Sequence, residues 1–131
     1  MASGEIHILP SDSTPEFLFC SDGRFKIRGR GLYKTETESV GELINWIDGY
    51  LGDPAEITYV VIALEYLNSY STTILVSILR RLNMVLLHSK KLVIQWYYEE
   101  DDEDLLERGE YISITFDIAV TFIPTNHITD R

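Results

Sequence analysis

The fold of this chain is decided by residues 57–98, ITYVVIALEYLNSYSTTILVSILRRLNMVLLHSKKLVIQWYY. Residues 57–67 are almost continuously apolar and rich in β-branched side chains, which is typical of a central strand covered on both faces. Residues 71–88 repeat leucine and isoleucine at helical spacing, and residues 92–98 form a second apolar run. Because a strand–helix–strand connection within one sheet is right-handed, the three segments predict a parallel βαβ unit.

The flanking sequence adds further elements to this unit. Residues 14–20 and 24–30 predict a hairpin around the turn 21–23, because Phe25 and Ile27 alternate with three cations. A helix is expected over 36–51, with Thr35 and Glu38 as a capping box, and a short acidic helix over 101–109. A last strand is expected over 118–123. The prediction is one α/β domain over residues 1–131, with a mixed sheet of about five strands packed with helices. Residues 1–13 and 124–131 are expected to be flexible termini.

Composition and charge exclude several classes of protein. The 131 residues are 45% hydrophobic and include one cysteine, so we expect a globular domain without an intrachain disulfide, suited to a reducing compartment. The apolar runs are too short to span a bilayer and the first residues lack a signal peptide, which predicts a cytoplasmic protein without membrane insertion. Residues 99–110 hold eight acids and one arginine, a large share of the net charge of −10. This charge argues against nucleic-acid binding.

A cluster of hydroxyl residues follows the strand predicted at 57–67. Residues 68–73, NSYSTT, lie between the carboxyl end of that strand and the following helix, where ligand and partner sites occur in such sheets. The hydroxyls could have no role other than to start the helix, because Ser, Thr and Asn are ordinary N-cap residues. Alternatively, a phosphate on Ser69 would lie near the free N–H groups of the helix N-terminus and would change any docking surface there.

The acidic residues 99–104 allow the same two interpretations. They precede Leu105 and Leu106, so they could be the solvated start of a helix, where negative charge is favourable. They could also form a docking surface for a basic partner, with Asp101, Asp102 and Asp104 as the contact residues. The run lacks the acid spacing and central glycine of a calcium loop.

The sequence predicts no catalytic, cofactor or metal site. His7, His88 and His127 are scattered without the spacing of zinc ligands, and no nucleophile motif surrounds Cys20. Glycines 29 and 31 do not form a phosphate-binding loop, because no strand-to-helix pattern of the required form follows them.

Several segments together resemble the SiaC-type bacterial regulatory phosphoproteins, which have a STAS-like fold related to that of the anti-sigma factor antagonists. The strongest are LEYLNSYSTTILVSIL (64–79) and VIQWYYEEDDEDLLERGE (93–110). The supporting segments are IRGRGLY (27–33), LINWIDGYL (43–51) and TFIP (121–124). The resemblance covers residues 14–124.

This resemblance implies a protein without catalysis of its own. Family members are phosphorylated directly after a Leu-Asn pair by a cognate protein kinase, and a PP2C-like phosphatase removes the phosphate. The unphosphorylated form binds and activates a diguanylate cyclase, which links the family to cyclic-di-GMP signalling and biofilm behaviour.

Carried over by position, the phosphoacceptor is Ser69, with Ser71 as a competing candidate and otherwise the helix N-cap. The family pattern has threonine followed by small residues, so Ser69 and Tyr70 depart from it. The residues expected to contact partners are Asn68, Tyr70, Ser71, Thr72, Asp101, Asp102 and Asp104.

Two other functions remain open. The chain could be a constitutive interaction module that docks through residues 99–110. It could also be an enzyme acting on a phosphorylated small molecule bound at the helix N-terminus.

Overall fold

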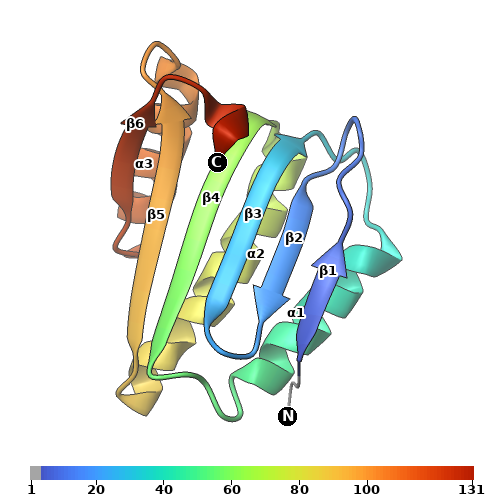
Figure 1. Ribbon diagram of the computed structural model, residues 1–131, viewed down its shortest axis with the longest axis vertical. Helices are drawn as coiled ribbons and strands as arrows, with labels where there is room; N and C mark the ends of the chain where they lie inside the picture. The colour runs from blue at the N-terminus through green and yellow to red at the C-terminus, as the bar shows by residue number, and fades with distance from the viewer. Residues whose placement is uncertain (1–3) are drawn as a thin grey trace.

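The computed structural model describes residues 4–131, which form a six-stranded sheet with three helices (Figure 1). The strands follow one another in sheet order as β1 (Glu5–Ile8), β2 (Glu16–Cys20), β3 (Arg24–Gly31), β4 (Ile57–Leu67), β5 (Lys91–Glu99) and β6 (Thr121–Thr125). The first three strands pair antiparallel and the last four pair parallel. The predicted mixed sheet is therefore confirmed, with one strand more than expected.

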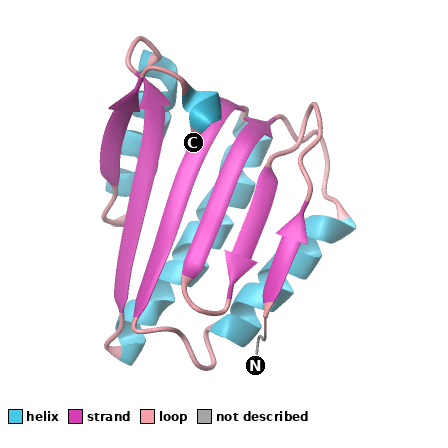
Figure 2. Cartoon of the chain, in the orientation of Figure 1, coloured by secondary structure: helices cyan, strands magenta, loops and turns pink. Residues whose placement is uncertain are grey.

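Each pair of consecutive parallel strands is joined by a helix. These helices are α1 (Glu38–Tyr50), α2 (Ser69–Asn83) and α3 (Glu103–Phe116). All three lie on the same face of the sheet, as right-handed crossovers that advance in one direction require (Figures 1 and 2). The βαβ unit predicted from residues 57–98 is confirmed, because β4 and β5 pair in parallel from Ile57 opposite Lys91 to Ala63 opposite Tyr97.

The hairpin of β2 and β3 is also confirmed. Phe19 and Phe25 are buried against α1, and Ile27 is buried on the same face of the sheet. Arg24 and Arg28 are exposed on the other face. The turn requires a glycine, because Gly23 has φ of +105° and a Cβ there would lie 2.3 Å from the carbonyl oxygen of Ile57.

The expectation that β4 is covered on both faces is wrong. Helices cover one face only (Figure 2), and Tyr59 on the other face is 47% exposed. The short 3-10 helix η2 (Ile128–Asp130) covers part of this open face, where Ile128 is buried and the Arg131 guanidinium lies 4.9 Å from the centre of the Tyr97 ring. The β-branched run of β4 is explained by its central position rather than by two helix layers.

Several element boundaries differ from the prediction. Strand β1 was not predicted, and residues 1–3 of the same terminal segment lie outside the described residues. Helix α1 has Thr37 rather than Thr35 as its N-cap, and α2 gives way at Met84 to the 3-10 helix η1 (Met84–His88).

Helix α3 does not end at Gly109 but continues to Phe116. Gly109 is buried where α3 crosses the sheet, and a Cβ there would lie 2.6 Å from Phe122 and 2.8 Å from Trp96. This glycine therefore allows close packing rather than ending the helix. The last strand is accordingly shifted to Thr121–Thr125.

Candidate functional site

The junction between β4 and α2 is organised by Asn68. This residue is the N-cap of α2, and its Oδ1 accepts a hydrogen bond from the Ser71 N–H at 2.8 Å. Its Nδ2 donates to the carbonyl oxygen of Tyr33 at 2.9 Å, and its own N–H donates to the carbonyl oxygen of Gly31. Asn68 thus begins the helix and also fastens it to the segment that follows β3. The expectation that Ser71 is the N-cap is wrong.

Ser71 faces the protein interior. It is 4% exposed, and its Oγ accepts a hydrogen bond from the N–H of Tyr33 at 2.9 Å. This hydroxyl supplies the partner that a buried N–H requires. In this structure Ser71, the competing candidate for phosphorylation, is therefore inaccessible and already bonded.

Ser69 faces the opposite way. It is the first residue of α2 and is exposed, and within residues 4–131 its hydroxyl makes no hydrogen bond. The neighbouring hydroxyls are bonded inside the helix, since Thr72 donates to the carbonyl oxygen of Asn68 and Thr73 to that of Tyr70. Of this cluster, Ser69 is the serine whose oxygen is both free and accessible.

The junction between β5 and α3 repeats the same arrangement with acids. Asp102 is the N-cap of α3, and its Oδ1 accepts from the Leu105 N–H at 3.1 Å. Glu103 and Asp104 occupy the first turn, where the helix dipole favours negative charge. Asp101 is exposed just before the cap. The predicted acidic helix start is confirmed as a structural feature.

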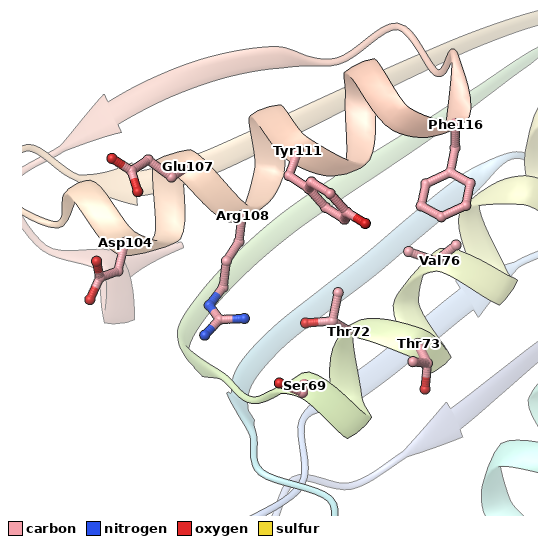
Figure 3. Close-up of a pocket in the computed structure, with 9 residues that line it drawn as sticks. All are labelled: Ser69, Thr72, Thr73, Val76, Asp104, Glu107, Arg108, Tyr111 and Phe116. Carbon is pink, nitrogen blue, oxygen red and sulfur yellow. The ribbon is translucent and has the colours of Figure 1, made fainter.

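The first turns of α2 and α3 border one groove, with a volume of about 660 Å³ (Figure 3). We call it the α2–α3 groove, and its lining residues are Ser69, Thr72, Thr73, Val76, Asp104, Glu107, Arg108, Tyr111 and Phe116. Val76 and Phe116 lie at one end of the groove and are apolar (Figure 3). The α2 side carries hydroxyls, and the α3 side carries two carboxylates and one guanidinium.

The groove brings together three residues that the sequence placed on two separate segments, namely Ser69, Thr72 and Asp104. The other five expected contact residues do not line it. Asn68 and Ser71 form hydrogen bonds with the backbone of Tyr33. Tyr70 is partly buried against the core, and Asp102 caps α3. Asp101 is exposed outside the groove lining.

Tyr111 and Phe116 were missed because α3 was expected to end at Gly109. Arg108 lies within the predicted helix but was missed because only the acids of that segment were considered as contact residues. The spacing of Asp104, Arg108 and Tyr111 places them on one face of a longer helix. That spacing is the signal that would have found them, once the glycine is understood as a packing position.

The remaining reactive side chains do not form a second site. Burial, followed by the nearby Glu5 carboxyl, raises the pKa of the Cys20 thiol, which lowers its thiolate content. His7 bonds the Glu16 carboxylate at 2.7 Å rather than a nucleophile. Within residues 4–131, no three His, Cys, Asp or Glu side chains are grouped to hold a metal ion, and no helix is both long and apolar enough to cross a membrane.

The sheet order and the three helices on one face define a STAS-like α/β domain, as the sequence predicted. The chain belongs to the SiaC family of regulatory phosphoproteins, whose family model matches residues 8–125.

Comparisons with known proteins point the same way. The uncharacterized protein PA14_02130 of Pseudomonas aeruginosa (strain UCBPP-PA14) is 25% identical over 107 residues, which is 81% of this chain and 85% of that one. The crystal structure of apo-SiaC from Pseudomonas aeruginosa superposes with a TM-score of 0.78 at 22% identity, covering 91% of this chain and 98% of that one.

A further solved structure shows the diguanylate cyclase SiaD of the same organism in complex with its activator SiaC. It matches with a TM-score of 0.81 at 22% identity, covering 92% of this chain and 99% of that one. At this level of identity, the two structural comparisons establish the shared fold.

Proposed function

We propose that this chain is a non-enzymatic signalling adaptor that is switched by reversible phosphorylation of Ser69. The observation that carries the proposal is the free, exposed Ser69 hydroxyl at the edge of the α2–α3 groove. Membership of a family of regulatory phosphoproteins supports a phosphorylated residue, and the position after Leu67-Asn68 matches the family pattern.

The proposed switch depends on the charge and size that a phosphate adds to Ser69. A cognate kinase transfers the γ-phosphoryl group of ATP to the Ser69 Oγ, which releases ADP and the hydroxyl proton. The product carries about two negative charges at neutral pH beside a groove that already holds the carboxylates of Asp104 and Glu107. A partner docked over the groove would have to desolvate this dianion, so phosphorylation weakens docking. A PP2C-like phosphatase reverses the change.

The partner that we propose for the unphosphorylated form is a diguanylate cyclase. The related SiaC protein of Pseudomonas aeruginosa is the activator of the cyclase SiaD and forms a complex with it. Binding to such a partner would link the chain to cyclic-di-GMP signalling, and biofilm formation is the behaviour expected to respond.

The test measures binding of the host's cognate cyclase to four forms of the chain: wild type, wild type phosphorylated by the cognate kinase, Ser69→Ala and Ser69→Glu. Mass spectrometry locates the phosphate. We expect phosphate on Ser69, unchanged binding by Ser69→Ala, and at least tenfold weaker binding by the phosphorylated and Glu forms, or about 1.4 kcal/mol. Ser13→Glu adds the same charge on the exposed loop between β1 and β2 and should bind like wild type.

A second function is favoured by the exposed carboxylates of α3, namely constitutive docking through residues 99–110. In that case all forms altered at Ser69 bind equally. The double variant Asp101→Asn, Asp104→Asn would instead weaken binding, and increasing salt would weaken it in the wild type. Asp102 is left unchanged in this variant because it caps α3.

A further inference from the structure

One charged side chain of the α2–α3 groove, that of Arg108, lacks an ion-pair partner among the described residues. Arg108 is exposed, and among residues 4–131 it makes no ion pair, although Asp104 precedes it by four positions and Glu107 is adjacent. Asp and Arg at this spacing on a helix often pair. Here the guanidinium instead extends away from the α3 acids, from α3 toward the first turn of α2 (Figure 3).

Among the described residues, Arg108 is also the one cation that lines the groove. It shares the lining with Ser69 and Thr72, and Figure 3 shows its side chain directed toward both. An arginine offers five N–H donors in a planar fork that matches two oxygens of a phosphate. The groove therefore presents a phosphate-binding group opposite the hydroxyl that we propose as phosphoacceptor.

We propose that Arg108 binds the phosphate of phosphorylated Ser69 and so holds this phosphate within the α2–α3 groove. This inference rests on the proposed function, because it takes Ser69 as the acceptor. The ion pair joins the first turn of α2 to α3, so the phosphate occupies the groove instead of extending into solvent. A partner then loses both the open groove and the free guanidinium.

The charges around this position make the inference measurable. The α3 groups that line the groove with Ser69 are Arg108, the carboxylates of Asp104 and Glu107, and the Tyr111 hydroxyl, whereas α2 contributes Thr72 and Thr73. Arg108 favours the dianion and the carboxylates oppose it. Removing the guanidinium leaves the carboxylates alone, so the second pKa of the phosphate must rise.

The experiment titrates this phosphate by ³¹P NMR. Phosphoserine is inserted at position 69 during translation, so no kinase is needed, and the chemical shift is followed between pH 4 and 8 around a second pKa of about 6. We expect Arg108→Gln to raise that pKa by about half a unit relative to the chain with Arg108, and the difference to shrink at high salt. Arg108→Lys, which keeps the charge but not the fork, should fall between them.

Arg80→Gln is the matched control. It removes the same charge from α2, but Arg80 lies 11 positions after Ser69, about 16 Å along the helix, with its guanidinium over the Phe116 ring. We expect it to leave the titration unchanged. Circular dichroism confirms that each variant is folded.

Each outcome decides a different point. Equal titration curves for Arg108→Gln and the parent overturn the role of Arg108 and leave Ser69 as the switch. Equal shifts from Arg108→Gln and Arg80→Gln also overturn it, because they show only a general charge effect. Failure of the cognate kinase to label Ser69 would remove the proposed function without altering this titration.

Discussion

The β4–α2 and β5–α3 junctions are built alike but carry different charges. Both lead from a parallel strand into a helix that is capped by an Asx residue, in one case Asn68 and in the other Asp102. In each case the Asx side chain accepts a hydrogen bond from the N–H three positions on. The first turn of α3 contains Glu103 and Asp104, whereas the first turn of α2 contains no acid. The two helices thus share the capping hydrogen bond, but the first turn of α3 already carries negative charge. The first turn of α2 is uncharged and can receive a charge that is added and removed.

The largest effect on the free energy of unfolding should come from how closely each helix packs on its neighbours. Gly109 brings α3 close to Trp96 and Phe122, so Gly109→Ala should force these groups apart and lower the free energy of unfolding by about 3 kcal/mol. Gly41 in α1 has open space around it, so Gly41→Ala should be neutral or stabilising by about 0.5 kcal/mol. Urea denaturation of both variants measures the contrast. Equal effects would mean that Gly109 is not a packing position.

The two caps should differ in strength. Asn68→Ala removes the cap and also the bond to the Tyr33 carbonyl, so we expect a loss of about 2 kcal/mol in unfolding free energy. Asp102→Ala removes a cap alone and should cost about 1 kcal/mol. The control Asn68→Asp keeps the cap acceptor but loses the Nδ2 donor, and should fall between wild type and Asn68→Ala. Equal losses at Asn68 and Asp102 would contradict the additional role of Asn68.

Ser69 and Ser71 of α2 should respond differently to the same change. Ser71→Ala leaves the buried Tyr33 N–H without a partner and should cost about 1.5 kcal/mol in thermal or urea unfolding. Ser69→Ala changes an exposed side chain and should stay within about 0.5 kcal/mol of wild type. A comparable loss at both positions would mean that Ser69 also supports the fold.

The smallest effect on the free energy of unfolding is expected at Ser69, where the first turn of α2 carries no charge. Ser69→Glu places an acid in the first turn of α2 and should stabilise the fold by about 0.5 kcal/mol at low salt, through the helix dipole. Ser69→Gln serves as the neutral control. The difference between the two should disappear at high salt, because the position is exposed. If Ser69→Glu is instead less stable than Ser69→Gln, the Asp104 and Glu107 carboxylates outweigh the dipole.

The sequence predicted the architecture where its pattern is periodic. The βαβ unit at 57–98 and the hairpin at 14–30 were found, because long apolar or alternating runs allow few alternatives. Strand β1 was missed, since four residues at the edge of a sheet show too short a pattern. The uncovered face of β4 was missed too, because an apolar run does not reveal how many layers cover it.

The candidate site was predicted along the chain but not in space. Ser69 and the acidic segment were found, yet Ser71 was not recognised as buried, because its partner Tyr33 lies 38 positions earlier. Tyr111 and Phe116 were missed because Gly109 resembled a helix end, and only the contacts with Trp96 and Phe122 explain a glycine inside the helix. The burial of Ser71 and the packing of Gly109 depend on which helices and strands become neighbours in the folded protein. The local sequence pattern does not contain this information.

The order of the strands has a consequence for how the chain is made. Each strand pairs with the strand that precedes it in the sequence, from β1 to β6, so no strand has to be inserted between two others. During synthesis on the ribosome, the β1–β3 meander can therefore form first, and each later βα unit adds to an existing sheet edge. Contacts between neighbours in sequence also lower the entropy lost in closing loops. We expect the N-terminal part to be protected from proteolysis before α3 and β6 have left the ribosome.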